Sequence, residues 1–175
     1  TAIVALEQLK DRFAVEPEHV AHGLSSLALP GRMEFYPSRP SLLFDVAHNH
    51  DKALALGAAL LRHFPDKRFV FVVAIADGKD AEAMIRTWSQ LPAQFVFTTF
   101  EVTHRSPVQP RTLQAIAEWF GAVARAVSEP VEALSIARRI AGADDLVVVT
   151  GSTFLVGTLS GWFLEDAGKA HRARV

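Results

Sequence analysis

The sequence predicts an α/β fold, in which a doubly wound, mostly parallel sheet is preceded by a β-hairpin strand and a short N-terminal helical appendage. Two observations support this prediction. Short, near-continuous apolar runs recur along the chain, as is typical of parallel strands that helices cover on both faces. Stretches with apolar residues at helical spacing separate these runs, and this alternation favours parallel strands joined by right-handed crossovers.

Four apolar runs are the candidate parallel strands: residues 41–46 (SLLFDV), 68–75 (RFVFVVAI), 94–99 (QFVFTT) and 145–150 (DLVVVT). The segment MEFY at 33–36 reaches the first of them through PSRP, which predicts an antiparallel hairpin. Residues 123–127 could form a further short strand, but the pattern there is ambiguous.

Between the strands, apolar residues at helical spacing define the helix faces expected to pack on the sheet. These stripes are Leu54, Ala58 and Leu61; Ala81, Met84, Ile85 and Trp88; Leu113, Ile116, Ala117 and Phe120; and Leu134, Ala137 and Ala141. Ahead of the sheet, residues 2–13 and 17–27 predict two helices. The following PGR turn predicts the domain boundary, with residues 1–28 as a helical appendage and residues 29–175 as the α/β domain.

Composition limits the class of protein. The 175 residues suit about one domain, and half of them are apolar. A net charge of −1 gives no sign of nucleic-acid or membrane binding. The lack of cysteine excludes disulfides, thiolate catalysis and cysteine-bound metal, and fits a cytoplasmic protein. We expect a monomer, and the start at Thr1, which resembles mid-helix, suggests a piece of a longer protein.

In a sheet of this kind, ligands bind outside the carboxyl ends of the strands. This rule selects four segments: residues 45–51 (DVAHNHD), 76–80 (ADGKD), 99–110 and 150–153 (TGST). Asp45 could accept hydrogen bonds from a ligand hydroxyl such as that of a ribose. His48 and Asn49 lie at the start of a helix, which favours an anion. Alternatively, Asn49 or Asp51 only caps the helix and His48 is a solvated turn residue.

Two further interpretations of residues 45–51, a metal site and a nucleophilic triad, have less support. His48 and His50 form an H-x-H pair of the kind used by metal hydrolases, but the remaining ligands are hard to find, and a barrel hydrolase would need about 250 residues. Ser152, His48 and Asp45 could make a nucleophilic triad, yet TGSTF does not match the G-x-S-x-G elbow. We therefore expect no metal ligand in this chain.

The TGST turn has two interpretations of similar weight. Gly151 would allow close approach of a ligand, with Ser152 and Thr153 offering hydroxyl and N–H groups. Alternatively, the turn is an ordinary helix cap after a buried strand. The chain contains neither G-x-G-x-x-G nor a P-loop sequence. Lys79 of ADGKD could lie near a phosphate, although a solvated helix start is the simpler expectation.

The segments PGRMEFY, LLFDVAHNH, GKD and DDLVVVTGSTFLVG follow one another in this order. Over about residues 1–160, the chain resembles the C-terminal domain of folylpolyglutamate synthase/dihydrofolate synthase, in the Mur ligase superfamily. Two positions depart from the family pattern: His50 replaces a proline, and Gly78 replaces the first aspartate of D-K-D. A related peptidoglycan ligase has a pattern similar to D-Y-A-H-T-P at the second of these motifs and D-N-P-R further on. This chain has neither pattern.

The resemblance implies an ATP-dependent ligase that joins L-glutamate to a folate or dihydropteroate carboxylate through an acyl phosphate. It implies that Arg32 binds the ATP phosphates and stabilises charge during transfer, and that Asp45 and Asn49 hold the nucleotide. His48 and Ser152 would bind glutamate. The P-loop and Mg²⁺ ligands would lie in a missing central ATPase domain, whose last helices residues 1–28 resemble, so the chain alone should be inactive. Another Mur-type ligase and a noncatalytic nucleotide- or partner-binding module are the alternatives.

Overall fold

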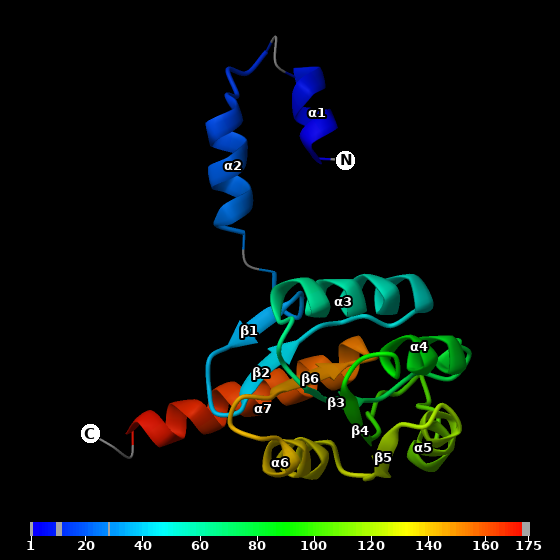
Figure 1. The fold of residues 1–175 in the computed structure, drawn as a ribbon. Helices are drawn as coiled ribbons and strands as arrows, with labels where there is room; N and C mark the ends of the chain where they lie inside the picture. The colour runs from blue at the N-terminus through cyan, green and yellow to red at the C-terminus, as the bar shows by residue number, and fades with distance from the viewer. Residues whose placement is uncertain (1, 10–11, 28, 173–175) are drawn as a thin grey trace. The chain divides into compact units, whose positions relative to one another are not determined.

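A computed structural model describes residues 2–9, 12–27 and 29–172, with side chains described up to residue 165. The chain divides into two compact units, Thr1–Pro30 and Gly31–Val175. Figure 1 labels their helices and strands. Among the described residues, no helix has the length and apolar character needed to cross a membrane.

The first unit contains the two predicted helices, α1 (Ala2–Leu9) and α2 (Pro17–Ser25). Glu16 caps α2 in a reciprocal arrangement with His19, and Pro17 occupies its first turn, where a missing N–H costs nothing. The helix predicted for residues 2–13 is shorter than expected, and its positions 10 and 11 lie outside the described residues. Neither helix has a buried residue, so the described residues of this unit form no core of their own.

The second unit is built on a six-stranded sheet in the order β1-β2-β6-β3-β4-β5. The strands are β1 (Glu34–Tyr36), β2 (Ser41–Phe44), β3 (Phe69–Val73), β4 (Ala93–Phe97), β5 (Val123–Ala126) and β6 (Leu146–Thr150). Strand β1 is antiparallel to β2, and all other pairs are parallel. The predicted fold class and hairpin are therefore confirmed, and the ambiguous run at 123–127 forms the edge strand β5.

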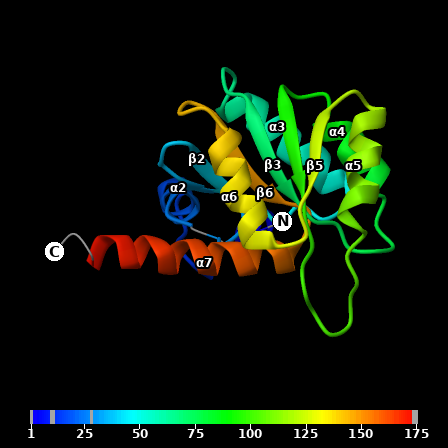
Figure 2. The same cartoon turned by 90° about the horizontal axis from the view of Figure 1, so that it is seen from below.

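Helices cover both faces of this sheet, as Figure 2 shows. Helices α3 (His50–His63), α4 (Ala81–Trp88) and α5 (Pro110–Trp119) pack on one face, and α6 (Pro130–Ile140) and α7 (Thr153–Arg172) pack on the other. Strands β3 and β6 are buried at every position. Burial of each large apolar side chain contributes roughly 1.5–3 kcal/mol, so the two central strands anchor the unit.

The face of α3 that packs on the sheet differs from the predicted one. Leu54 and Leu61 are each 49% exposed, and the buried positions are Ala53, Leu56, Gly57 and Leu60. Because α3 carries apolar residues around its whole circumference, spacing alone permits two stripes and packing selects one. The stripes predicted for α4, α5 and α6 do pack on the sheet.

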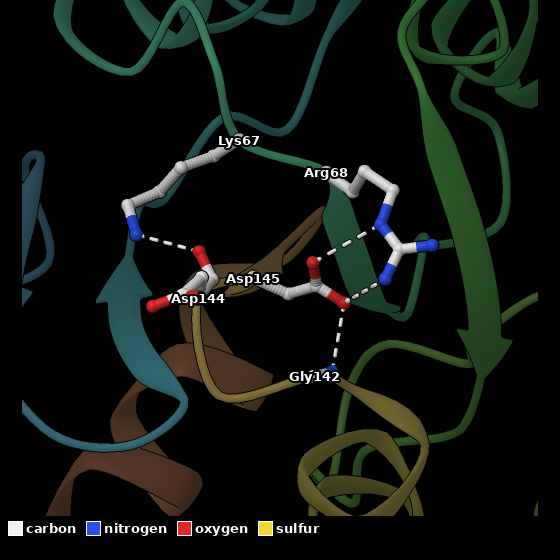
Figure 3. A network of polar contacts seen from close by, with 5 residues as sticks. All are labelled: Lys67, Arg68, Gly142, Asp144 and Asp145. Carbon is white, nitrogen blue, oxygen red and sulfur yellow. Dashed lines mark hydrogen bonds and ion pairs between the residues drawn. The ribbon is translucent and has the colours of Figure 1, made fainter.

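A polar network holds the amino ends of β3 and β6 (Figure 3). Arg68 donates from Nε and Nη2 to the two carboxylate oxygens of Asp145, each at 3.2 Å, and the Gly142 N–H donates to Oδ2 at 2.8 Å. Lys67 Nζ donates to the Asp144 carbonyl at 2.6 Å. These contacts lie at the opposite edge of the sheet from the predicted ligand segments.

Candidate functional site

The carboxyl ends of β2, β3 and β6 converge on one cavity, which we call the carboxyl-edge cavity. The segments after these strands lie side by side because the three strands are neighbours in the sheet. The long segment between β4 and α5 projects from the body of the unit (Figure 2) and contributes one arginine to the cavity. The volume is about 310 Å³, and the lining residues are His48, Ala76, Lys79, Arg105, Gly151, Ser152, Thr153 and Phe154.

Arg32 lies in a turn whose backbone is fixed at three points. The Gly31 N–H donates to Glu34 Oε2 at 2.7 Å, and the Gly31 carbonyl accepts from the Val46 N–H at 2.8 Å. On the other side of Arg32, the Met33 N–H donates to an oxygen of Asp45 at 3.0 Å. The Arg32 side chain is exposed and makes no hydrogen bond or ion pair within the described residues. The turn therefore presents a free guanidinium.

This turn needs an uncommon backbone. Gly31 has φ +65°, and a Cβ built there would approach Val46 Cγ1 to 2.9 Å. Met33 has φ +46°, which residues other than glycine rarely adopt. Such a conformation costs about 1–3 kcal/mol and persists only where the surroundings enforce it. The hydrogen bond from Met33 to Asp45 is one contact that enforces it.

Both carboxylate oxygens of Asp45 accept hydrogen bonds from backbone N–H groups. Oδ2 accepts from the Met33 N–H at 3.0 Å and Oδ1 accepts from the Ala47 N–H at 2.9 Å, while the residue is only 9% exposed. The prediction of a free acceptor at the end of the strand is therefore incomplete, because both oxygens already have a donor. Each oxygen keeps a second lone pair for a ligand.

Glu34 links the turn to the only tyrosine of the chain. Its Oε1 accepts from the Tyr36 hydroxyl at 2.6 Å, while its Oε2 accepts from Gly31. Burial, followed by the hydrogen bond to Glu34 and by the Glu34 charge, raises the pKa of Tyr36 to about 12. The hydroxyl therefore remains a donor over a wide pH range.

His48 and Asn49 both contact the start of α3. Asn49 is the N-cap, and its Oδ1 accepts from the Lys52 N–H at 3.0 Å, as the capping alternative predicts. His48 Nδ1 lies 2.9 Å from the Val46 carbonyl and Nε2 lies 3.2 Å from Lys52 Nζ. His48 lines the cavity and is thus more than a solvated turn residue.

The TGST turn caps a helix, as one of its two interpretations predicts, and its ligand-binding role stays a prediction. Ser152 is 3% exposed, and its Oγ accepts from the Phe154 N–H at 3.2 Å, so it caps α7 while it lines the cavity. Gly151 has φ +94°, and a Cβ there would lie 2.5 Å from the Ala74 carbonyl oxygen. The close neighbour of Gly151 is thus the backbone after β3, and no ligand is needed to explain the glycine.

Lys79 and Arg105 are the charged residues of the cavity lining, and both are cations. Neither side chain has an ion pair within the described residues. The sequence marks Lys79 only as a weak candidate, and it does not single out Arg105 within the predicted segment 99–110. The residues around Arg105 form no motif that would identify it. The path of the long segment between β4 and α5 brings this residue to the cavity.

The alternative arrangements find little support. No hydrogen bond joins Asp45, His48 and Ser152 within the described residues, as a nucleophilic triad would require. The same part of the chain holds no group of three His, Asp or Glu side chains that could bind a metal ion. His50 is the first residue of α3, where proline is also favoured, so its replacement of the family proline leaves the helix start in place. Gly78, the other departure, has φ +77°.

The chain is similar to known proteins of one family. The family described as "Mur ligase, glutamate ligase domain" matches residues 31–153. The chain is 25% identical to the probable dihydrofolate synthetase of Schizosaccharomyces pombe over 90% of its length, and covers 40% of that protein. It is 26% identical to the dihydrofolate synthase/folylpolyglutamate synthase of Mycobacterium tuberculosis over 66% of its length, and covers 24% of that relative.

Solved structures show the same fold. The Mycobacterium tuberculosis folylpolyglutamate synthase complexed with ADP superposes with a TM-score of 0.79 at 24% identity, over 93% of this chain and 39% of that one. The Escherichia coli FolC structure, in complex with DHPP and ADP, gives a TM-score of 0.77 at 22% identity, over 89% and 36%. The chain spans two fifths or less of these relatives. It belongs to the Mur ligase family, as a glutamate ligase domain.

Proposed function

We propose that this chain is the amino-acid-binding part of an ATP-dependent ligase that joins L-glutamate to a folate-type carboxylate. The observation that carries the proposal is the carboxyl-edge cavity, in which Lys79 and Arg105 face a small volume without a lining carboxylate. Glutamate has two carboxylates, and two cations complement them. The names of the relatives support the same chemistry.

In the proposed reaction, ATP phosphorylates the acceptor carboxylate, and the glutamate amine attacks the acyl phosphate to leave an amide, ADP and phosphate. Arg32, exposed on its fixed turn, would stabilise charge on the transferred phosphoryl group. His48 and Ser152 would contribute to binding of the amino acid at the cavity. Asp45 and Asn49 would contact the nucleotide with the atoms that the backbone leaves free. The chain mainly positions substrates, which is where such a reaction gains most of its rate.

The described residues do not fit a Mg²⁺ site, because no three His, Asp or Glu side chains gather there. We propose that Mg²⁺ and the P-loop belong to a central ATPase domain outside this chain, and that residues 1–28 are the last helices of that domain. The two helices of this unit have no buried residue, as expected of helices taken from a larger core. The complete enzyme would be a cytoplasmic monomer.

The test is the release of ADP by the full-length protein with ATP, L-glutamate, and either folate or dihydropteroate. We expect release only with glutamate and one of the two acceptors, and none from the isolated chain. In the full-length protein, Lys79→Met and Arg105→Met should each raise the KM for glutamate about tenfold or more. Arg62→Met on the outer part of α3 is the matched control. Unchanged KM values in both cavity variants would refute the assignment.

A further inference from the structure

A lysine that does not appear in the cavity lining lies directly beside it. Lys52 Nζ is 3.2 Å from Nε2 of His48, and His48 lines the carboxyl-edge cavity. Lys52 is half-buried, and its N–H donates to the cap residue Asn49, so its backbone is fixed. The ammonium group is therefore held at the edge of a cavity that already contains two cations.

The two contacts of His48 together define its protonation. The Val46 carbonyl can only accept, so Nδ1 must carry the proton, at 2.9 Å from that oxygen. The ammonium of Lys52 can only donate, so Nε2 must carry a lone pair. These requirements are met by one form of the ring, the neutral Nδ1–H tautomer. His48 then acts as the acceptor that holds Lys52.

The place of Lys52 in α3 is unfavourable for the helix. It is the third residue of the helix, where the positive end of the macrodipole favours an acid and disfavours a cation. Helix stability thus gives no reason for a lysine here. Two of the three N–H donors of its ammonium have no partner within the described residues.

We propose that Lys52 is a third anion-binding residue of this site, and that His48 is the positioning residue that holds its ammonium group. This inference rests on the proposed function, because it takes the ligand to be an anionic group of a ligase substrate. The shared chemistry is an oxyanion, either a carboxylate of the amino acid or a phosphate of the nucleotide. His48 contributes through Lys52, and its neutral ring adds no fourth charge to Lys52, Lys79 and Arg105.

The first test measures steady-state kinetics of the full-length protein. Lys52→Met should raise a KM about tenfold, for L-glutamate if the group is a carboxylate and for ATP if it is a phosphate. Lys52→Arg, which keeps the charge and a donor for Nε2, should recover most of the loss. Lys67→Met makes the same change at the opposite edge of the sheet and should leave both KM values unchanged. No change in either KM for Lys52→Met would overturn the proposal.

A double-mutant cycle separates the positioning role of His48 from direct binding. If His48 acts through Lys52, then His48→Ala and Lys52→Met each raise the same KM, and the double variant is no worse than the Lys52 variant. If His48 binds substrate by itself, the two effects multiply, and that result would overturn its positioning role.

The second test needs no substrate and uses the 175-residue chain. Nitrogen NMR at a pH above the ordinary histidine range should show His48 protonated at Nδ1, with an Nε2 signal that moves in Lys52→Met. The same variant should melt slightly higher, because a cation leaves the first turn of α3. A proton on Nε2 of His48 would show that this nitrogen does not accept from Lys52, and would overturn the proposed pair of His48 and Lys52. If the pair is present but the full-length protein shows no glutamate-dependent activity, the proposed function fails and the anion-binding role fails with it.

Discussion

Replacing Asp45 by asparagine should lower the stability of the α/β unit by about 3 kcal/mol. The two side chains have the same shape, so packing is unchanged and only the hydrogen bonding differs. Asp45 accepts from Met33 and Ala47 with different oxygens, and the asparagine amide can keep only one of these acceptors. A hydrogen bond to a buried charged group is worth about 1.5–3 kcal/mol, so one contact is lost and the other is weakened.

Thermal unfolding of the 175-residue chain, followed by circular dichroism, measures this effect. For a unit of this size, 1 kcal/mol corresponds to about 2–4 °C, so we expect a melting temperature roughly 6–12 °C lower. Asp66→Asn, at an exposed turn residue, is the matched control and should change stability by less than about 0.5 kcal/mol. A melting temperature of Asp45→Asn within about 2 °C of the wild type would refute the reasoning and leave Asp45 free for a ligand.

The same variant separates two explanations for a loss of ATP use in the full-length protein. If Asp45 acts by holding the turn, then Asp45→Asn impairs both stability and ATP use. Arg32→Met, at an exposed residue, impairs ATP use alone. Equal melting temperatures for Arg32→Met and wild type are therefore part of the prediction.

Three further predictions concern stability and protonation. The absorbance of Tyr36 at high pH should show a midpoint near 12 in the folded chain, against about 10 when denatured. Because the unfolded chain loses this proton first, the stability of the folded chain should fall between these pH values. Glu34→Gln should lower the folded midpoint. A midpoint near 10 in the folded chain would contradict this. His50→Pro should raise stability by about 0.4–1 kcal/mol in urea unfolding, since His50 begins α3 and the residue before it is extended; a loss would show that the turn cannot accept a proline. Asp145→Ala should lower the stability by about 1–3 kcal/mol, because it leaves the Gly142 N–H without an acceptor. Arg68→Ala should lower it by less than about 1 kcal/mol, because the Arg68 side chain is 70% exposed. Equal losses of stability would contradict this ordering.

Much of the fold could be predicted because the central strands are almost entirely apolar. Residues 69–73 and 146–150 are buried on both faces, and apolar runs this short and this rich in valine favour strands. The edge strand β5 was ambiguous because VARA alternates exposed and half-buried positions over only four residues. The face of α3 could not be read from its sequence, since Leu54 and Leu61 extend its apolar surface beyond the buried stripe.

The site was predicted at the level of segments and less well at the level of atoms. The rule of strand carboxyl ends selected the loops that contain His48 and Ser152, and both line the same cavity. It could not show that the backbone already uses Asp45 and the side-chain oxygen of Asn49. Arg105 could not be predicted, because its position depends on how a twelve-residue segment between β4 and α5 folds.

The position of β6 in the sheet has a consequence for the order of synthesis. Strand β6 is the last strand to leave the ribosome, yet it lies between β2 and β3. Until residues 146–150 emerge, the sheet consists of two separate pieces, a hairpin of β1 and β2 and a ribbon of β3, β4 and β5. The segment that follows β6 also carries Ser152, which meets His48 from the other end of the domain. A nascent chain therefore has no complete carboxyl-edge cavity until its final strand is inserted.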